Sequence, residues 1–245
     1  MIPVGTSLPT RRTAGMTYLI ILVTIAVWIE IQGAGQDPVV LATTICNLGM
    51  VPGELTHMAP IGLAVPLGPG LACVVDNNAI NIFTPLLSIF LHGSWTHLLG
   101  NMLFLWVFGR NIEDRMGHGR FLGFYLICGI VASVAQILSS PASPVPTVGA
   151  SGAISGVMGA FLVLYPNVRV KMFFFIILAD VRAWMVLIYW FLLQLFEGVV
   201  TAGTMGSEVS GGVAVWAHVG GFVMGLLLVK AFTSRRAVAA RPAAG

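Results

Sequence analysis

The chain has 245 residues, of which 57% are hydrophobic and only 9% are charged, and its mean hydropathy is +0.93. Soluble domains carry about 25% charged residues, so this composition excludes a water-soluble enzyme. It also excludes a disordered chain, which would be polar and rich in charge. Three cysteines exclude a scaffold built from disulfides. The net charge of +3 comes with no basic stretch interleaved with aromatic residues, so nucleic-acid binding has no support.

Six apolar stretches approach the length of a membrane span, which needs about 20 mostly apolar residues. We therefore predict an all-α, polytopic membrane protein with a six-transmembrane-helix bundle. The predicted spans are residues 16–32, 96–108, 121–138, 149–165, 183–200 and 213–232. The second span is short, and the apolar residues 82–91 before it predict a turn or a shallow membrane dip. Residues 172–178 are too few to cross and predict an interfacial hairpin before the fifth helix.

The positive charges test this map. All twelve Lys and Arg residues lie at the N-terminus, in the second and fourth loops and at the C-terminus. These four segments share one side of a six-span protein, so the positive-inside rule places both termini in the cytoplasm. We predict a cytoplasmic N-terminal segment (1–15), a membrane domain (16–232) and a disordered cytoplasmic tail (233–245). A short N-terminus without a soluble domain or transit-like segment favours a bacterial inner membrane.

The first span has two interpretations. Arg11 and Arg12 before an apolar run, with small residues at 33–35, also fit a cleaved signal peptide. The length of the run and the aromatic Trp28 near its outer end favour a membrane anchor. Charge does not separate the two, because removal of this span would still leave the C-terminus inside.

The long outer connection, from Gly33 to about Leu91, contains two of the cysteines. Cys46 and Cys73 would lie on the oxidising side of the membrane, where they can pair. Two buried free thiols fit the sequence equally well, because spacing alone does not establish closeness. Cys128, inside the third span, is predicted to be a small apolar residue.

Polar side chains inside membrane spans are costly and mark function by default. His97 and Asn101 are four residues apart, on one face of the second helix. Ser151 lies near the start of the fourth span and His218 near the start of the sixth. These three helices all run from outside to inside, so at about 1.5 Å per residue the four groups share one shallow layer below the outer surface.

Glycines at helical spacing lie beside this layer, on the fourth and sixth spans. Small residues let membrane helices approach closely, so packing through these glycines would bring Ser151 and His218 within reach of each other. The glycines are Gly152, Gly156, Gly159, Gly221 and Gly225.

The chemistry that fits such a layer is serine-based acyl transfer. A serine hydroxyl is a weak nucleophile unless an adjacent base takes its proton, and His218 can do so. The oxyanion that follows needs fixed donors, which the side chains of Asn101 and His97 and the backbone N–H of Ser151 can supply. Neither Asp nor Glu shares this depth near His218, so the sequence predicts a dyad. Taken singly, each residue is more typical of a helix cap or an interhelical bridge.

Three motifs resemble those of the rhomboid intramembrane serine proteases, and the resemblance extends over roughly residues 48–230. It implies that Ser151 is the nucleophile, His218 its base, and His97 and Asn101 the oxyanion donors, with His92 in support. It also implies cleavage of transmembrane protein substrates in or near their spans, within the lipid bilayer and without metal or cofactor. The motifs are His92-Gly-Ser-Trp-Thr-His97-Leu-Leu-Gly-Asn101, Gly149-Ala-Ser151-Gly152 and Ala217-His218-Val-Gly-Gly221.

Two features depart from that family. Some members carry an aromatic residue four positions after the nucleophile, which stacks on the catalytic histidine; here this position is Ser155. His218 must then be oriented otherwise, and we expect Trp216 or a water molecule to do so. Some members also carry a Trp-Arg pair in the first loop, which here contains no Arg.

Two other functions fit the residues less well. A non-catalytic relative would bind membrane-protein clients, but loss of Ser151 or His218 would be typical of it. A metal carrier would use His92, His97 and His218, but no carboxylate accompanies them, and a metal would not explain the motif around Ser151. The sequence predicts neither the substrate nor the oligomeric state.

Overall fold

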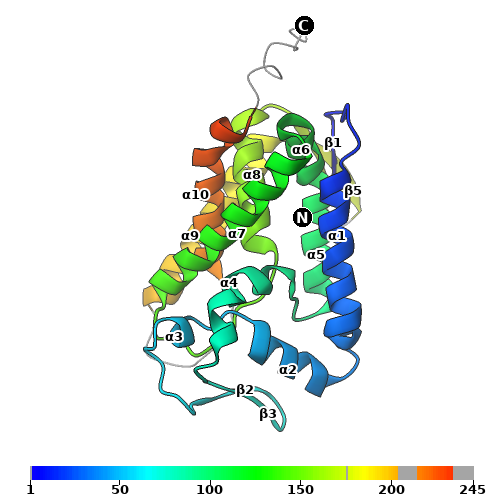
Figure 1. Ribbon diagram of the computed structural model, residues 1–245. Helices are drawn as coiled ribbons and strands as arrows, with labels where there is room; N and C mark the ends of the chain where they lie inside the picture. Colours follow the sequence, from blue (N-terminus) through cyan, green and yellow to red (C-terminus); the bar gives the residue numbers. More distant parts are fainter. Residues whose placement is uncertain (1, 175, 204–213, 234–245) are drawn as a thin grey trace, which may run out of the picture.

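The computed structural model describes residues 2–174, 176–203 and 214–233, and the protein is mostly helical (Figure 1). The longer helices run side by side in a bundle, and short helices and a strand pair gather at one end of it. The helices are α1 (Gly15–Ala26), η1 (Val27–Ile31), η2 (Gly33–Gly35), α2 (Pro38–Leu48), α3 (Pro52–Leu55), η3 (Ala79–Phe83), α4 (Thr84–Leu87), η4 (Ser88–Phe90), α5 (Trp95–Phe104), η5 (Leu105–Gly109), α6 (Arg110–Met116), α7 (His118–Ser139), α8 (Ser151–Leu164), α9 (Ala183–Gly203) and α10 (Val215–Phe232). The strands are β1 (Ile2–Thr6), β2 (Ala64–Gly68), β3 (Leu71–Val74), β4 (Arg169–Phe174) and β5 (Ile177–Arg182).

Within the described residues, three helices are long and apolar enough to cross a membrane: α7, α9 over Ala183–Val200, and α10. The stretches Gly15–Ile31 and Ser151–Leu164 are apolar helices of intermediate length. The second predicted span is part of a longer helix, because the backbone stays helical from α5 through η5 into α6. Residue 213 of the sixth predicted span and residues 234–245 of the predicted tail lie outside the described residues.

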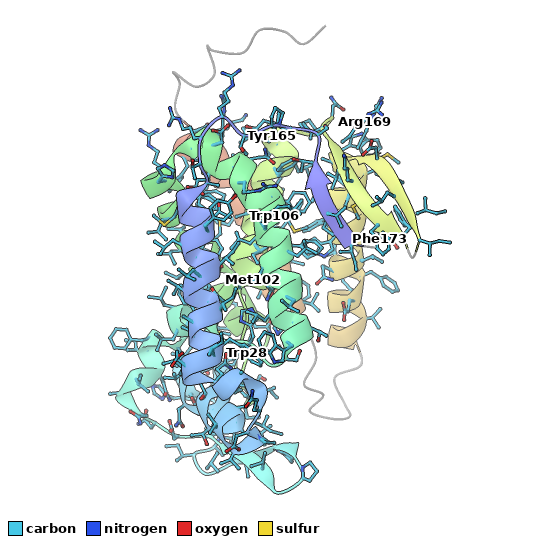
Figure 2. The ribbon with its side chains drawn as sticks, turned by 90° about the vertical axis from the view of Figure 1, so that its right-hand side faces the viewer. Trp28, Met102, Trp106, Tyr165, Arg169 and Phe173 are labelled. Carbon is cyan, nitrogen blue, oxygen red and sulfur yellow. A yellow bond between two sulfur atoms is a disulfide. The ribbon has the colours of Figure 1, made fainter. Side chains whose placement is uncertain are left out.

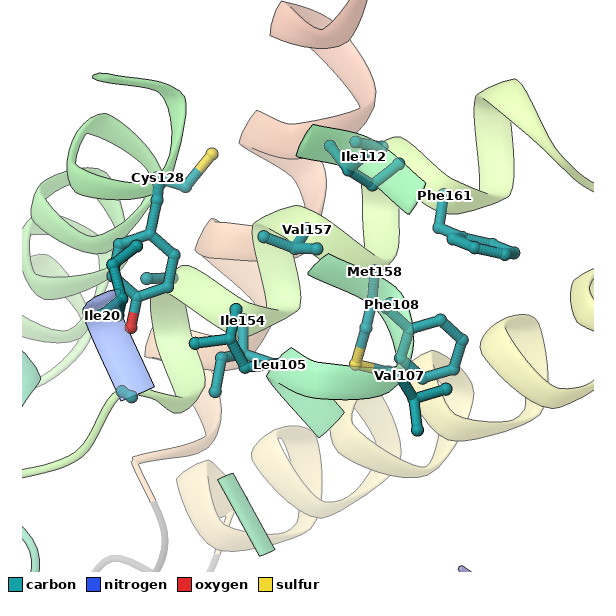
Figure 3. Close-up of a cluster of buried hydrophobic side chains, with 14 of the residues drawn as sticks. Ile20, Leu105, Val107, Phe108, Ile112, Cys128, Ile154, Val157, Met158 and Phe161 are labelled. Carbon is teal, nitrogen blue, oxygen red and sulfur yellow. The ribbon is translucent and has the colours of Figure 1, made fainter. Parts of the chain in front are cut away.

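The core lies around α8, whose residues 152–161 are all buried. Apolar side chains from α1, η5, α6 and α7 pack against this helix (Figure 3). On its other side α8 meets α10 with almost no side chain between them. A Cβ added to Gly221 or Gly225 of α10 would strike the carbonyl oxygen of Gly152 or Gly156. The predicted glycine contact between the fourth and sixth spans is therefore confirmed.

The prediction of an all-α protein is confirmed only in part, because the mostly helical chain also contains strands. Residues 172–178 belong to a hairpin, as expected, but this hairpin is longer and pairs β4 with β5. The N-terminal strand β1 adds antiparallel to β4, which gives a three-stranded sheet in the order β1-β4-β5. Such pairing joins segments more than 160 residues apart, so local sequence patterns do not reveal it.

The outer connection folds into short helices and the β2-β3 hairpin, shown at the lower end of Figure 1. A disulfide between Cys46 of α2 and Cys73 of β3 links the two parts, which decides the question that the sequence left open. Residues 79–90 form three consecutive short helices, η3, α4 and η4, before the second long helix. Cys128 is a buried free thiol within α7, as predicted.

Helix α1 is held in the bundle at both ends. At its start, the buried Glu113 of α6 accepts hydrogen bonds from the backbone N–H groups of Met16 and Thr17, and it also contacts His118. Near its other end Trp28 is fully buried and packs edge-on against Trp95. The indole ring of Trp28 is therefore part of the core.

Candidate functional site

Ser151 and His218 meet where α8 and α10 begin. The Nε2 atom of His218 lies 2.7 Å from the Oγ atom of Ser151, within hydrogen-bond distance. Ser151 is the first residue of α8, and its side chain is partly accessible, whereas His218 is 7% exposed. Gly221, about one turn past His218 on α10, contacts Gly152, the residue after Ser151, and this contact sets the two helix ends close together.

The other ring nitrogen of His218 has a partner that the sequence did not indicate. Its Nδ1 atom lies 2.5 Å from Oε1 of Gln194, a half-buried residue of α9. One turn earlier on α9, the ring of Trp190 lies 5.8 Å from the imidazole, tilted by 42°. Our expectation that Trp216 orients the histidine is not supported, because the Trp216 ring packs towards Gly198. A glutamine in a membrane span was the signal that could have revealed this contact.

His97 and Asn101 lie on the other side of Ser151, next to Gly149. A Cβ added to Gly149 would come within 2.9 Å of the His97 ring and 3.6 Å of Asn101 Nδ2. Gly149 also has a φ of 130°, in the region that favours glycine. Both constraints explain why a glycine stands two residues before Ser151. Ser94 caps α5, because its Oγ accepts from the backbone N–H of His97.

His92 stands behind Asn101. It is fully buried, and its Nε2 lies 2.9 Å from Asn101 Nδ2. Because the amide nitrogen can only donate, His92 Nε2 accepts and the ring carries its proton on Nδ1. The side chain of Gln32 holds this segment through two hydrogen bonds with the His92 backbone. Together these contacts fix the Asn101 amide and leave its second N–H available to a ligand.

Ser155, the position of the missing aromatic residue, is buried against the helix itself. Its Oγ donates to the backbone carbonyl of Ser151 at 2.6 Å. Ser155 is therefore not the residue that orients the imidazole of His218; beyond Ser151, the ring is contacted by Gln194 and Trp190 of α9.

A pocket opens beside Ser151 between α8, α7 and the segment that precedes α8. Its lining includes Met50, Gly129, Thr147, Gly149 and Ala217. Among the residues that the structure describes, no three His, Cys, Asp or Glu side chains are grouped closely enough to hold a metal ion.

These features define a helical membrane protein in which a serine–histidine pair lies close to donor groups. The family model of the Rhomboid domain matches residues 77–235, which include all the residues of this site except Gln32 and Met50. The chain belongs to the rhomboid family and is an integral membrane protein.

Curated relatives agree with this assignment over about a third of the chain. Rhomboid protease GluP of Bacillus subtilis is 46% identical over 85 residues, which are 35% of this chain and 16% of that protein. Rhomboid protein 1, mitochondrial, of Saccharomyces cerevisiae is 36% identical over 92 residues, 36% of this chain and 27% of that protein. The human presenilin-associated rhomboid-like protein, mitochondrial, is 34% identical over 91 residues, 36% of this chain and 24% of that protein. The aligned part of this chain thus spans about a quarter or less of these relatives' length.

Proposed function

We propose that this protein is an intramembrane serine endopeptidase that hydrolyses peptide bonds in or near the transmembrane segments of membrane proteins. The observation that carries the proposal is the 2.7 Å contact between Ser151 Oγ and His218 Nε2, made across two packed helices. Family membership and the similarity to a rhomboid protease support the same reaction.

The reaction needs only groups of this chain and water. Ser151 Oγ attacks the peptide carbonyl carbon while His218 Nε2 takes the hydroxyl proton. The negative oxygen of the tetrahedral intermediate would be bound by the side chains of His97 and Asn101 and by the N–H of Ser151. The intermediate collapses, and the amine leaves with the proton from His218. Water, deprotonated by His218, then hydrolyses the acyl ester and frees Ser151.

We also propose the arrangement in the membrane. The six spans would be α1 with η1, the helix formed by α5, η5 and α6, and the helices α7, α8, α9 and α10. Residues 1–15 and 233–245 would lie on the cytoplasmic side of a bacterial inner membrane, around a membrane domain of residues 16–232. The positions of the twelve Lys and Arg residues support this orientation.

Two alternative functions receive less support. A metal carrier would need free imidazole nitrogens, but both ring nitrogens of His218 are engaged, by Ser151 and Gln194. A client-binding protein without activity would not need a hydrogen bond from a serine to a histidine. It remains the second candidate, because it would use the same membrane fold.

An activity-based probe tests the proposal without a known substrate. The purified full chain is treated with a fluorophosphonate, and the adduct is located by mass spectrometry. We expect an adduct on Ser151 that is lost in Ser151→Ala and in His218→Ala. Ser155→Ala is the matched control, since it removes a serine one turn along α8 and should still be labelled. A folded protein that is not labelled, while a known family member is, would favour the client-binding alternative.

A further inference from the structure

We propose that Gln194 is a positioning residue that holds His218 in the tautomer required for catalysis, in the place that a carboxylate occupies in a serine–histidine–aspartate triad. The inference rests on the proposed function. It is based on the 2.5 Å contact between Gln194 Oε1 and His218 Nδ1.

The direction of this hydrogen bond decides whether His218 can act as a base. When the amide oxygen accepts, the imidazole carries its proton on Nδ1, and Nε2 has a free lone pair for the Ser151 hydroxyl. If the amide nitrogen faced the ring, the proton would sit on Nε2, and the serine would have no base. A neutral glutamine thus selects the tautomer as the aspartate of a triad does, but without its charge.

The surroundings of Gln194 favour a specific role over general packing. Its neighbours Leu192, Leu193 and Phe196 are 45–69% exposed on α9, on a surface that faces lipid in the proposed arrangement. A polar amide on such a helix is costly unless it is hydrogen-bonded. Trp190, one turn away, packs on both His218 and Phe222 and fixes the ring plane. Helix α9 therefore supplies both the hydrogen bond and the ring contact that orient His218. Ser155 of α8 supplies neither.

The test compares Gln194→Met, which keeps the side-chain length but removes the acceptor, with Gln194→Glu, which can only accept. Activity is measured on a transmembrane model substrate as a function of pH, together with thermal unfolding. We expect Gln194→Met to lower kcat roughly 10- to 100-fold with little change in KM. Gln194→Glu should keep substantial activity and shift the acid limb of its pH profile upward, because a carboxylate stabilises the protonated imidazole. The matched control is Gln136→Met on α7.

Equal losses in both variants, with an unshifted pH profile, would overturn the positioning role, as would full activity of Gln194→Met. Failure of the proposed function looks different, because the wild type would then cleave the substrate no faster than Ser151→Ala does. If Ser151→Ala is inactive and Gln194→Met is fully active, only the role of Gln194 is lost.

A separate observation concerns the outward face of the β1-β4-β5 sheet, which changes from charged to apolar along its length. Rows of paired residues show the change: Arg169 faces Arg182, Lys171 faces Asp180, and then Phe173 faces Leu178. At the tip, Ile176, Ile177 and Leu178 are 91%, 62% and 65% exposed. The opposite face is covered at Val170 and Met172, which are buried, but it is open at the tip, where Ile177 belongs to it.

The sheet is placed so that this tip lies along the side of the bundle. In Figure 2, Arg169 is level with Tyr165 near one end of the bundle, and Phe173 lies further along, beyond the level of Trp106. We infer that the sheet is a membrane-surface element that binds anionic phospholipid. The apolar tip enters the boundary between headgroups and acyl chains, and Arg169, Lys171 and Arg182 contact the phosphates.

The chain suits a fluorescence test, because Cys128 is buried and the other cysteines form a disulfide. An environment-sensitive label on Leu178→Cys is compared with one on Asp180→Cys, in phosphatidylcholine vesicles with and without phosphatidylglycerol. We expect lipid-borne quenchers to quench the label at position 178 and aqueous iodide to quench the one at 180. Phosphatidylglycerol should strengthen the lipid quenching, and Arg169→Gln with Arg182→Gln should abolish that gain. Equal iodide quenching at both positions, or crosslinking of Leu178→Cys to a second copy, would overturn the inference.

Discussion

Helices α8 and α9 both contribute to the candidate site, yet they are held in the protein in different ways. Helix α8 is buried over ten consecutive residues and touches α10 backbone to backbone through glycines. Helix α9 buries few of its side chains, and most of its large apolar residues are exposed. It contacts the rest of the protein through α10, α8 and the sheet strands β4 and β5.

The two helices therefore have different tasks in the site: α8 holds the nucleophile, and α9 orients the base. The nucleophile Ser151 begins the most constrained helix, where packing leaves no room for displacement. Gln194 and Trp190 come from a helix that buries few of its side chains, and elements with few buried contacts open at a lower free energy. We therefore expect the base to be easier to misorient than the nucleophile.

The largest effect is expected from the same substitution made in the two helices. Phe161 of α8 is 0% exposed, and Phe196 of α9 is 69% exposed. Phe161→Ala should lower the free energy of unfolding by about 3–5 kcal/mol, because it leaves a cavity in the core. Phe196→Ala should change it by less than about 0.5 kcal/mol. Denaturation of both variants in the same detergent measures the difference, and equal losses would show that α9 is buried against a partner.

A smaller effect is expected at the crossing of α8 and α10. Gly225→Ala places a methyl group against the carbonyl oxygen of Gly156, and this overpacking should cost roughly 1–3 kcal/mol. Gly123→Ala on α7 is the control, because its added Cβ would be 3.7 Å from the ring of Phe232, an ordinary contact. Thermal unfolding in detergent checks the pair. If Gly225→Ala is as stable as Gly123→Ala, the two helices do not meet at these glycines.

The smallest effect on stability is expected from a substitution in the outer connection, where the polar groups of Glu54 and Asp76 lie close together. Burial raises the pKa of Glu54, and the nearby carboxylate of Asp76 raises it further, while a hydrogen bond from the Asp76 backbone opposes both. An acid with a raised pKa in the folded state stabilises the protein below its unfolded pKa, and this stability is lost as the pH rises through the folded value. Glu54→Gln should therefore flatten the decline of the unfolding temperature above about pH 4.5. An unchanged slope from there to neutral pH would contradict the burial of this carboxyl group.

The sequence determined the features that depend on local composition and periodicity. Apolar runs located the long helices to within a few residues, apart from the end of the second, where polar residues such as Glu113 continue the helix and bind the start of α1. Residue spacing and helix direction placed Ser151 and His218 at one depth, and the structure brings them into contact. The glycine spacing also predicted which helices approach most closely.

Only the tertiary structure decided the contacts between distant segments. The Cys46–Cys73 disulfide, the addition of β1 to β4 and the contact of Gln194 with His218 each depend on how separate elements pack. Gln194 is the clearest case, because an amide in an apolar helix signals a partner but does not say which one. The partner is set by the rotation of α9 about its axis, which follows from packing against α8 and α10. A single sequence carries no direct record of that rotation, because many residues determine it together.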